Sequence, residues 1–408
     1  MSLATFIITP LELPEIRTTI GKFLGRSDLV QCLYVCRAWH ASFLPLVWST
    51  LSILSEERFP AVEAFNSHRH LIRNLSYYIP LWRVYKSPYC RNVSTLHVYC
   101  NWNESPVIAP YNQLRQLSIT GEKAYNYYDY TRWKLPDSFR NLSSLELEDV
   151  DIEPSSTDDV WDLCTGLKSL SIRRTNIARL PDKSMRFERL EKLALLPRSG
   201  HSFEQQLEFI TQCSSLVSLE WDRKAICTST STDNFAAHLA KGTWPRLCEL
   251  RLRNFYPSDR QLGKIINGIQ KIKSLDVDRG KFGKSIIPEV LVSCPQLEIL
   301  IAGEVTSEDI LQGPPWVCEQ EFGLRDNGTG SAARIGLQLG KGLEYLVTLK
   351  KLRHLHLGHR SNCKTKADAK WMLDNWKSLE FVEGPISHGG SGWSLMEMVQ
   401  ARKIWCDC

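Results

Sequence analysis

The sequence predicts an α/β fold in which short repeated strands form a curved parallel sheet with helices on its outside. A recurring phrase is the first reason: CTGLKSLSI at 164–172 returns as CSSLVSLEW at 213–221 and as CPQLEIL at 294–300. The last two apolar positions of the phrase alternate with other residues, so they share one face of a strand. One short strand cannot bury that face alone, whereas a stack of such strands can. The phrase therefore predicts a solenoid.

Regular spacing is the second reason. The middle apolar residue of the phrase recurs at intervals of 21 to 31 residues, mostly near 25. The leucine-rich repeat has a period of about 20–29 residues with a strand and a helix in each repeat, and the sequence resembles that family over most of its length. The pattern is weakest around Leu324, where the flanking positions are polar. The middle positions are Leu51, Leu75, Leu96, Leu117, Leu145, Leu170, Leu193, Leu219, Leu250, Leu275, Leu300, Leu324, Leu355 and Leu379.

Composition narrows the class of protein. The 408 residues are 43% hydrophobic and 23% charged, as in an ordinary globular protein. The formal net charge of +5 is small for this length and gives no argument for a nucleic-acid-binding surface. No apolar run approaches the roughly 18 residues that span a bilayer, and 6–8 is too short for a signal-peptide core. We therefore expect a cytoplasmic and/or nuclear protein with no nucleic-acid or membrane partner.

The cysteines follow the repeat. Thirteen are present, and five share one slot, three residues before the first apolar residue of the phrase. A recurring slot indicates small buried hydrophobic side chains rather than disulfides, which fits a reducing compartment. No zinc-ligand spacing accompanies them. The five are Cys90, Cys164, Cys213, Cys294 and Cys318.

The first fifty residues differ from the rest and predict three short helices. The first helix is expected to begin near Pro14 and to end at Gly25. Ser27 is expected to cap the second, and Pro45 is expected to end the third. The apolar stripe of the first helix, at i, i+4, i+7 and i+8, comprises Ile16, Ile20, Phe23 and Leu24.

This region resembles the F-box, a three-helix motif of about forty residues. The matching features, in the order and spacing of that family, are Leu13-Pro14, Asp28-Leu29, Val35-Cys36, Trp39 and Trp48. The resemblance implies that the motif docks onto the Skp-type adaptor of a cullin–RING ubiquitin ligase, while the other domain holds the protein to be ubiquitinated. A generic helical cap on the repeat stack is the alternative.

The resemblance also implies a division of the chain and a set of contact residues. The division is an N-terminal extension at 1–10, an F-box at 11–50 and a leucine-rich-repeat solenoid with its C-terminal cap at 51–408. Cys36, Phe43 and Trp48 are expected to pack internally. The expected adaptor contacts are Pro14, Ile16, Leu24, Leu29, Val35 and Trp39.

Side chains that alternate with the buried strand positions are expected on the concave face of the sheet. Three successive strands there alternate in sign, with Glu220 and Asp222, then Arg251 and Arg253, then Asp276 and Asp278. The favoured interpretation is a ladder of ion pairs. The alternative is that Arg251 and Arg253 bind an acidic or phosphorylated segment of a target protein. Other side chains expected on this face are His97, Tyr99, Glu146, Glu148, Ser171, Arg173, His354 and His356.

An aromatic-rich insertion interrupts the repeats at 125–133. Tyrosine and tryptophan contribute much of the binding energy of protein interfaces, and they also pad longer repeats, so both interpretations stay open. The candidate binding residues of the insertion are Tyr127, Tyr128, Tyr130 and Trp133.

Signals for enzymatic activity are weak. The stretch GTGSAA at 328–333 resembles a dinucleotide-binding loop but lacks the third glycine and the acidic residue that should follow. We expect no catalytic residue, cofactor or metal, and no RING-type array is present. The sequence therefore predicts a substrate-recognition adaptor of a cullin–RING (SCF-type) ligase. The alternative is a leucine-rich-repeat scaffold whose F-box serves complex assembly without ubiquitination.

Overall fold

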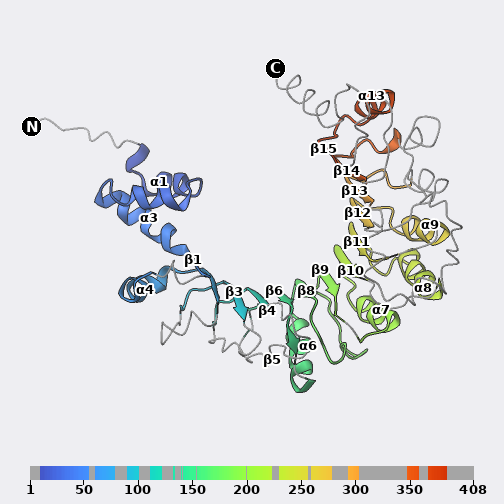
Figure 1. Cartoon of the computed structure of the whole chain (residues 1–408), viewed down its shortest axis with the longest axis horizontal. Helices are drawn as coiled ribbons and strands as arrows, with labels where there is room; N and C mark the ends of the chain where they lie inside the picture. Colours follow the sequence, from blue (N-terminus) through green and yellow to red (C-terminus); the bar gives the residue numbers. More distant parts are fainter. Residues whose placement is uncertain are drawn as a thin grey trace, which may run out of the picture. The chain divides into compact units, whose positions relative to one another are not determined.

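The computed structural model describes residues 10–54, 60–78, 90–100, 111–121, 132–133, 139, 141–152, 154–198, 200–222, 229–255, 259–277, 293–302, 347–357 and 366–383. The chain divides into two compact units, Met1–Ala178 and Arg179–Cys408. Each unit contains parallel strands that follow one another in chain order, with helices in the connections (Figure 1).

The first unit begins with helices and continues into a parallel sheet. Its helical segments are η1 (Pro10–Glu12), α1 (Pro14–Gly21), α2 (Arg26–Cys32), α3 (Arg37–Ser49), α4 (Val62–His68), η3 (Arg69–Leu71), η5 (Pro154–Ser156) and α6 (Thr157–Cys164). Its sheet strands are β1 (Thr50–Ile53), β2 (Asn74–Tyr78), β3 (Thr95–Cys100), β4 (Gln116–Gly121), β6 (Ser144–Glu148) and β8 (Ser169–Arg173). A separate pair is formed by β5 (Arg132–Trp133) and β7 (Asp151–Ile152).

The second unit repeats the same plan. Its strands are β9 (Lys192–Leu196), β10 (Ser218–Asp222), β11 (Glu249–Arg253), β12 (Ser274–Val277), β13 (Ile299–Ala302), β14 (His354–Leu357) and β15 (Phe381–Glu383). Its helices are α7 (Phe203–Thr211), α8 (Ser229–Ala240), α9 (Asp259–Asn267) and α13 (Lys366–Asn375). These four helices lie on one side of the strands in Figure 1. The parallel one-strand-per-repeat arrangement predicted from the sequence is therefore confirmed within each unit.

Register is kept by the predicted leucines. Leu75 lies opposite Leu51 and Leu96, and Leu250 lies opposite Leu219 and Leu275. All six side chains are nearly fully buried. Burying a leucine side chain contributes roughly 1.5–3 kcal/mol, so each repeat adds a similar stabilising increment.

Recurring main-chain hydrogen bonds link successive repeats just before each strand begins. The backbone carbonyl two residues before the central leucine accepts hydrogen bonds from two successive N–H groups of the next repeat, at 2.7–3.1 Å. This contact is made by main-chain atoms, so any residue can occupy the position. The carbonyls belong to Arg73, Ser94, Arg115, Ser143, Glu191, Val217, Cys248, Lys273 and Glu298.

The slot that the cysteines share is a turn into the strand. The carbonyl of the slot residue accepts the N–H of the apolar residue three positions later, as from Leu167 to Cys164 at 3.1 Å. Cys90, Cys164, Cys213 and Cys294 are fully buried there, as predicted, and Cys318 lies outside the described residues. In other repeats the same slot holds Tyr111, Phe139, Phe187, Trp244, Ile269, Leu349 and Trp376.

Two predicted strand positions are wrong. Leu379 occupies the turn that leads into β15, because its N–H binds the carbonyl of Trp376, and Val382 takes the central place opposite Leu355. The strand predicted around Leu324 does not lie between its expected neighbours. Leu324 itself is outside the described residues, but β13 pairs directly with β14.

The helix boundaries near the N-terminus also differ from expectation. Helix α1 ends at Gly21 rather than Gly25, so Phe23 leaves the predicted stripe and is 86% exposed. Gly25, rather than Ser27, is the N-cap of α2. Pro45 does not end α3 but lies inside it, on the exposed side of a helix that continues to bury Val47.

Strand ends turn sharply at a third recurring position, four residues after the central leucine. Asp149, Arg174 and Asn254 occupy it with φ of 53°, 47° and 50°, a left-handed conformation that is unfavourable for most side chains. Gly121 occupies it in β4 for a different reason. A Cβ on Gly121 would lie 2.0 Å from the backbone oxygen of Asp149, so only glycine allows the two repeats to approach.

We predict that Gly121→Ala lowers the free energy of unfolding by about 1–3 kcal/mol, because the methyl group would displace backbone rather than a mobile side chain. Chemical denaturation of both variants measures the effect. Gly166→Ala is the control, since its nearest neighbouring atom lies 4.0 Å away. Equal stability of the two variants would contradict the close approach.

We predict that the slot cysteines react slowly with thiol reagents at pH 8. Burial raises the pKa of Cys90 to about 12 and that of Cys294 to about 11, and it also raises the pKa of Cys164, so almost no reactive thiolate forms. Cys36 is exposed and should react at once. Mass spectrometry of tryptic peptides distinguishes the two classes, and unfolding in guanidinium should make them react alike. Rapid native modification of Cys164 would disprove its burial.

Candidate functional site

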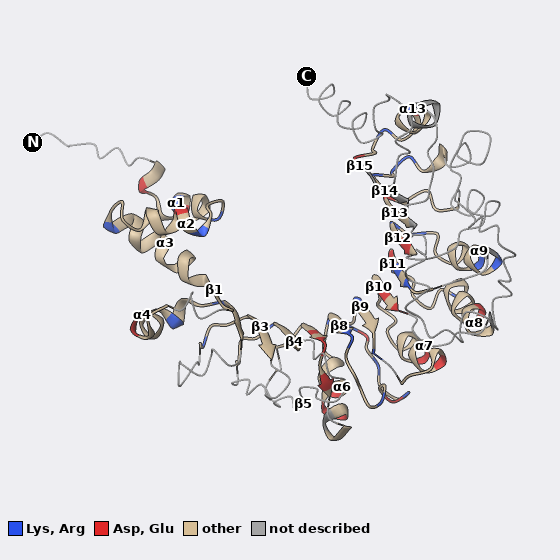
Figure 2. Cartoon of the chain, in the orientation of Figure 1, with Lys and Arg blue, Asp and Glu red and all other residues tan. Residues whose placement is uncertain are grey.

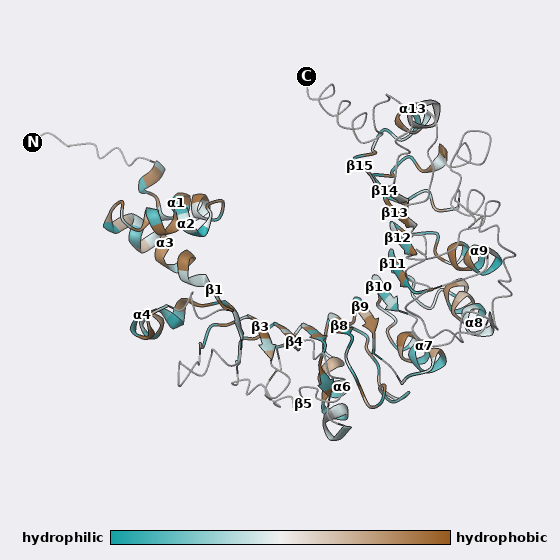
Figure 3. Ribbon diagram, viewed as in Figure 1, coloured by the Kyte–Doolittle hydropathy of each residue, from teal (hydrophilic) through white to brown (hydrophobic). Residues whose placement is uncertain are grey.

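The N-terminal helical segment exposes large apolar side chains, most of them in the connections between its helices. We call these residues the N-terminal apolar set: Leu11, Leu13, Ile16, Phe23, Tyr34 and Val35. Their exposed fractions range from 39% for Ile16 to 86% for Phe23. Hydrophobic residues are frequent along these helices (Figure 3). A gathering of exposed apolar side chains is typical of a surface that binds another protein.

Beneath this set lies a small core that holds the helices together. Leu29 of α2 packs with Phe43 and Val47 of α3, and partly buried residues including Trp39 and Leu46 surround them. The rings of Trp39 and Phe43 meet edge to face with centroids 5.3 Å apart. The absence of a side chain at Gly21 lets α1 lie directly against Leu46 and Phe43.

A buried arginine positions the start of the apolar set. Arg17 of α1 is 6% exposed, and its Nε donates to the Ser42 hydroxyl of α3 at 2.9 Å. One terminal nitrogen of the same guanidinium donates to the Leu11 carbonyl at 3.1 Å. Arg17 thus ties η1 to both α1 and α3, and it fixes where Leu11 and Leu13 emerge.

The expected adaptor contacts fall into three groups. Pro14, Ile16 and Val35 are exposed, and Leu24 and Trp39 are half-buried. Leu29 is 7% exposed and belongs to the core, so it can shape the surface from below but offers little area for direct contact. Among the residues expected to pack internally, Phe43 is buried and Trp48 is half-buried, whereas Cys36 is exposed.

The helices join the sheet of the first unit without a connecting segment. Helix α3 ends at Ser49, and β1 begins at Thr50. The Ser49 carbonyl accepts the N–H of Arg73 at 2.9 Å, and the ring of Trp48 lies 4.9 Å from that of His68. The N-terminal apolar set is therefore held in a defined position relative to the first strands.

In the second unit, charged side chains lie on the face of the strands opposite the buried leucines, which we call the outward face. These charges neutralise one another. Arg251 lies between two carboxylates, with its Nε 2.6 Å from Asp276 and its Nη1 3.9 Å from Glu220. Arg253 donates from Nε to Glu220 at 2.6 Å. Figure 2 shows acidic and basic residues on neighbouring strands β10 to β12. The predicted ion pairs are present among Glu220, Arg251, Arg253 and Asp276, whereas Asp222 accepts from Asn254 and Asp278 lies outside the described residues. Binding of a target protein by the two arginines stays a prediction.

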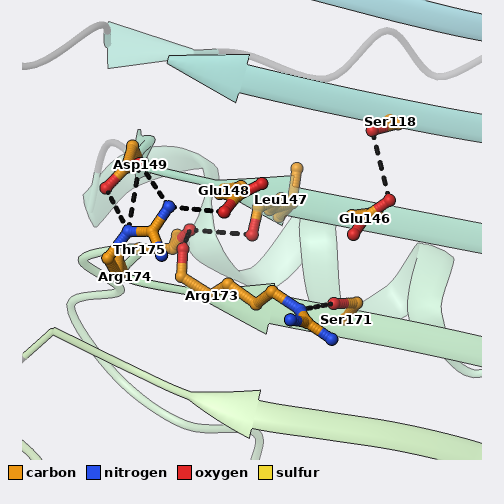
Figure 4. A network of polar contacts seen from close by, with 9 residues as sticks. All are labelled: Ser118, Glu146, Leu147, Glu148, Asp149, Ser171, Arg173, Arg174 and Thr175. Carbon is orange, nitrogen blue, oxygen red and sulfur yellow. Dashed lines mark hydrogen bonds and ion pairs between the residues drawn. The ribbon is translucent and has the colours of Figure 1, made fainter. Parts of the chain in front are cut away.

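In the first unit, charged side chains gather at the ends of β6 and β8 (Figure 4). Arg174 donates to both carboxylate oxygens of Asp149 at 2.8–3.1 Å and also contacts Glu148. The hydrogen bonds to Asp149 and the nearby negative charges raise the pKa of Arg174. The hydroxyl of Thr175 donates to the Leu147 carbonyl at 3.1 Å, which closes the turn from inside. This network fixes the edge of the sheet.

The aromatic insertion is only partly described. Tyr127, Tyr128 and Tyr130 lie outside the described residues. Trp133 belongs to β5, whose two residues pair with β7 directly beyond the Asp149 turn. Whether these aromatic residues bind a target or pad the repeat stays open. The glycine stretch at 328–333 also lies outside the described residues.

Within the described part of the chain, no group of three or more His, Cys, Asp or Glu side chains could hold a metal ion. Among the same residues, no helix is both long and apolar enough to cross a membrane.

Sequence reasoning missed four of the six residues of the N-terminal apolar set. Leu11, Leu13, Phe23 and Tyr34 were not among the expected adaptor contacts, and Phe23 was placed in the apolar stripe of the first helix. The glycines at 21 and 25 on either side of Phe23 were a usable signal, because a large aromatic residue in so short a connection has no helix face to bury it.

Comparison with known proteins gives weak structural likenesses. No family model matches the sequence, and no curated protein sequence is similar to it. The internalin InlF from Listeria monocytogenes is 13% identical with a TM-score of 0.40, covering 96% of this chain and 100% of its own. The leucine-rich-repeat ectodomain of the receptor kinase GASSHO1/SCHENGEN3 from Arabidopsis thaliana, in complex with CASPARIAN STRIP INTEGRITY FACTOR 2, is 12% identical with a TM-score of 0.31, covering 84% of this chain and 40% of its own. The fold assignment rests on the repeat and its parallel register.

We predict that Arg251→Met lowers the free energy of unfolding by about 1–2 kcal/mol, because Glu220 and Asp276, which are 8% and 7% exposed, would lose the cation between them. Denaturation at neutral pH measures the loss. Arg246→Met is the matched control, since Arg246 is 59% exposed and 3.9 Å from Glu191, where an ion pair contributes little. A loss of unfolding free energy no greater than that of the control would show that the ion pairs of Arg251 do not contribute to stability.

Proposed function

We propose that this protein is the substrate-recognition adaptor of a cullin–RING (SCF-type) ubiquitin ligase. Its N-terminal helices would dock the Skp-type adaptor, and its repeats would bind the target protein. The observation that carries the proposal is the N-terminal apolar set, exposed in η1, in α1 and in the connections before and after α1 and α2, within a segment whose sequence resembles the F-box. A chain that needed these helices only as a cap would be expected to turn such side chains inward.

The direct passage from α3 into β1 supports this function. A receptor contributes to ubiquitin transfer by holding its target at a fixed distance and angle from the ubiquitin-carrying enzyme. With no residue between Ser49 and Thr50 to act as a hinge, docking of the helices would orient the first strands at the same time. This chain would supply proximity and orientation and no chemistry of its own.

A non-catalytic scaffold is the second candidate function. The repeats offer a regular sheet face for protein binding in either case, and the same helices could assemble a complex that ubiquitinates nothing. The two candidates differ in their partners: a receptor purifies with both cullin and adaptor, whereas a scaffold purifies with the adaptor alone. Affinity purification with the proteasome inhibited would distinguish them and retain the target protein.

We predict that the double variant Ile16→Asp, Val35→Asp weakens binding of the Skp-type adaptor at least about tenfold, because carboxylates would enter an apolar interface without partners. Both positions are exposed, at 39% and 60%, so the variant should still fold. A quantitative pull-down with purified adaptor measures the loss, and circular dichroism of the same samples checks the fold.

The control for this experiment is Leu54→Asp, which changes an equally exposed leucine just beyond β1. It should leave adaptor binding unchanged. Leu29→Asp is unsuitable, because it would place a carboxylate in the helical core and unfold the surface rather than remove a contact. Undiminished adaptor binding by the Ile16, Val35 double variant would disprove the docking surface.

A further inference from the structure

The strands of the two units differ in how their outward charges are satisfied. In the second unit, Arg251 and Arg253 are held by Glu220 and Asp276. In the first unit, most outward side chains are uncharged. Because side chains that already satisfy one another have little to offer a ligand, the strands of the first unit are better suited to recognise a partner.

One row of outward residues crosses the first sheet at right angles to its strands. Strand register places these residues opposite one another, one from each strand, and all are half-buried. We call them the serine row: Ser52, Ser76, His97, Ser118, Glu146 and Ser171. Four of the six are small hydroxyl residues, which leave room above the strands and offer both donors and acceptors.

Glu146 stands out within this row. Its carboxylate accepts a hydrogen bond from the Ser118 hydroxyl at 3.3 Å, and its neighbours in register are Ser118 and Ser171. Arg173, on the same face of β8, donates from Nε to the Ser171 hydroxyl at 3.1 Å, so its guanidinium lies at the next residue of the row. The contrast with Glu148 on the same strand is direct, because Glu148 is met by Arg174. Figure 4 shows Glu146 turned toward Ser118, away from the cluster around Arg174. Glu146 is therefore a half-buried carboxylate that can still accept a strong ionic hydrogen bond.

Exposed aromatic surface lies beside the serine row. Tyr99 of β3 is 36% exposed, and its partner in register on β2 is Tyr78. Tyr99 follows His97 by two residues, and Tyr78 follows Ser76 by two residues. Both tyrosines therefore lie on the same outward face as the serine row. An aromatic face stacks well on a flat peptide group, a proline ring or a guanidinium.

We infer that the outward face of β3, β4 and β6 binds an extended segment of a partner protein that carries an arginine or lysine. The cationic group of the segment pairs with Glu146, the serine row hydrogen-bonds its main chain, and Tyr99 contacts an apolar or aromatic residue. The inference rests on the proposed function in taking this segment as part of the target, and it commits to a basic protein segment rather than an acidic one.

Geometry sets the spacing of the recognised residues. Neighbouring strands lie about 4.8 Å apart, so β3 and β6, two strands apart, are separated by roughly 9.6 Å. An extended peptide advances about 3.3 Å per residue. Tyr99 also lies two residues, roughly 7 Å, further along its strand than the serine row, so it is about 12 Å from Glu146. The residue that meets Tyr99 and the basic residue that meets Glu146 should therefore be about three to four positions apart in the segment.

Charge excludes the opposite class of ligand at this position. An acidic or phosphorylated segment laid along the serine row would place its negative charge against Glu146. Like charges placed side by side disfavour binding. The phosphates of a nucleic acid would meet the same carboxylate.

Selection from a peptide library tests the inference. The full chain is immobilised and used to select from a phage-displayed library of random nine-residue peptides. The expected result is severalfold enrichment of arginine and lysine over aspartate and glutamate, with an aromatic residue or proline about three to four positions from the basic residue. For a selected peptide, Glu146→Gln and Tyr99→Ala should each weaken binding by about tenfold in fluorescence anisotropy.

Glu249→Gln is the matched control, because Glu249 is an exposed strand glutamate of β11, outside the serine row. It should leave selection unchanged. Enrichment of acidic peptides, no enrichment, or basic enrichment that survives Glu146→Gln would each overturn the inference. The adaptor pull-down separates this failure from failure of the proposed function, since Glu146→Gln should bind adaptor normally and the Ile16, Val35 double variant should still select basic peptides.

Discussion

Register between neighbouring strands is the constraint on which the rest of the molecule depends. Side chains alternate across a strand, so a slip of one residue would bring Leu117 or Leu250 to the surface and bury the polar residue beside it. Two features oppose such a slip: the column of buried leucines and the carbonyl that receives two N–H groups from the next repeat. These two features also align the side chains of every outward row, including the ion-pair ladder and the serine row.

The same alignment explains why the strands of the two units present different surfaces. In the second unit, residues opposite one another in register carry opposite charge, as Arg251 does between Glu220 and Asp276. In the first unit, Glu146 has serines on both sides. Identical backbone geometry thus yields a self-neutralised face in one case and an open acceptor in the other, and the difference is made by the residue type at a single position of each repeat.

Much of this architecture is predictable from the sequence, because the leucines and the turn slot repeat with a recognisable period. The exceptions have particular causes. Phe23 was misplaced because the stop at Gly21 depends on packing against Leu46 and Phe43, which are distant in the sequence. Leu379 was misplaced because a leucine in the turn after Trp376 looks the same in sequence as a leucine in the centre of a strand. The environment of Glu146 was not predictable either, because a carboxylate on a strand looks the same in sequence whether its neighbour in register is an arginine or a serine.

The main-chain hydrogen bonds between repeats have an evolutionary consequence. Since the carbonyl that leads into each strand can belong to arginine, serine, lysine, valine, cysteine or glutamate, one repeat meets the next through contacts that do not depend on side-chain identity. Recombination that adds or removes a whole repeat would therefore join compatible backbones. Such a gene could change the length of its recognition surface in steps of about 25 residues while each surviving repeat kept its own fold.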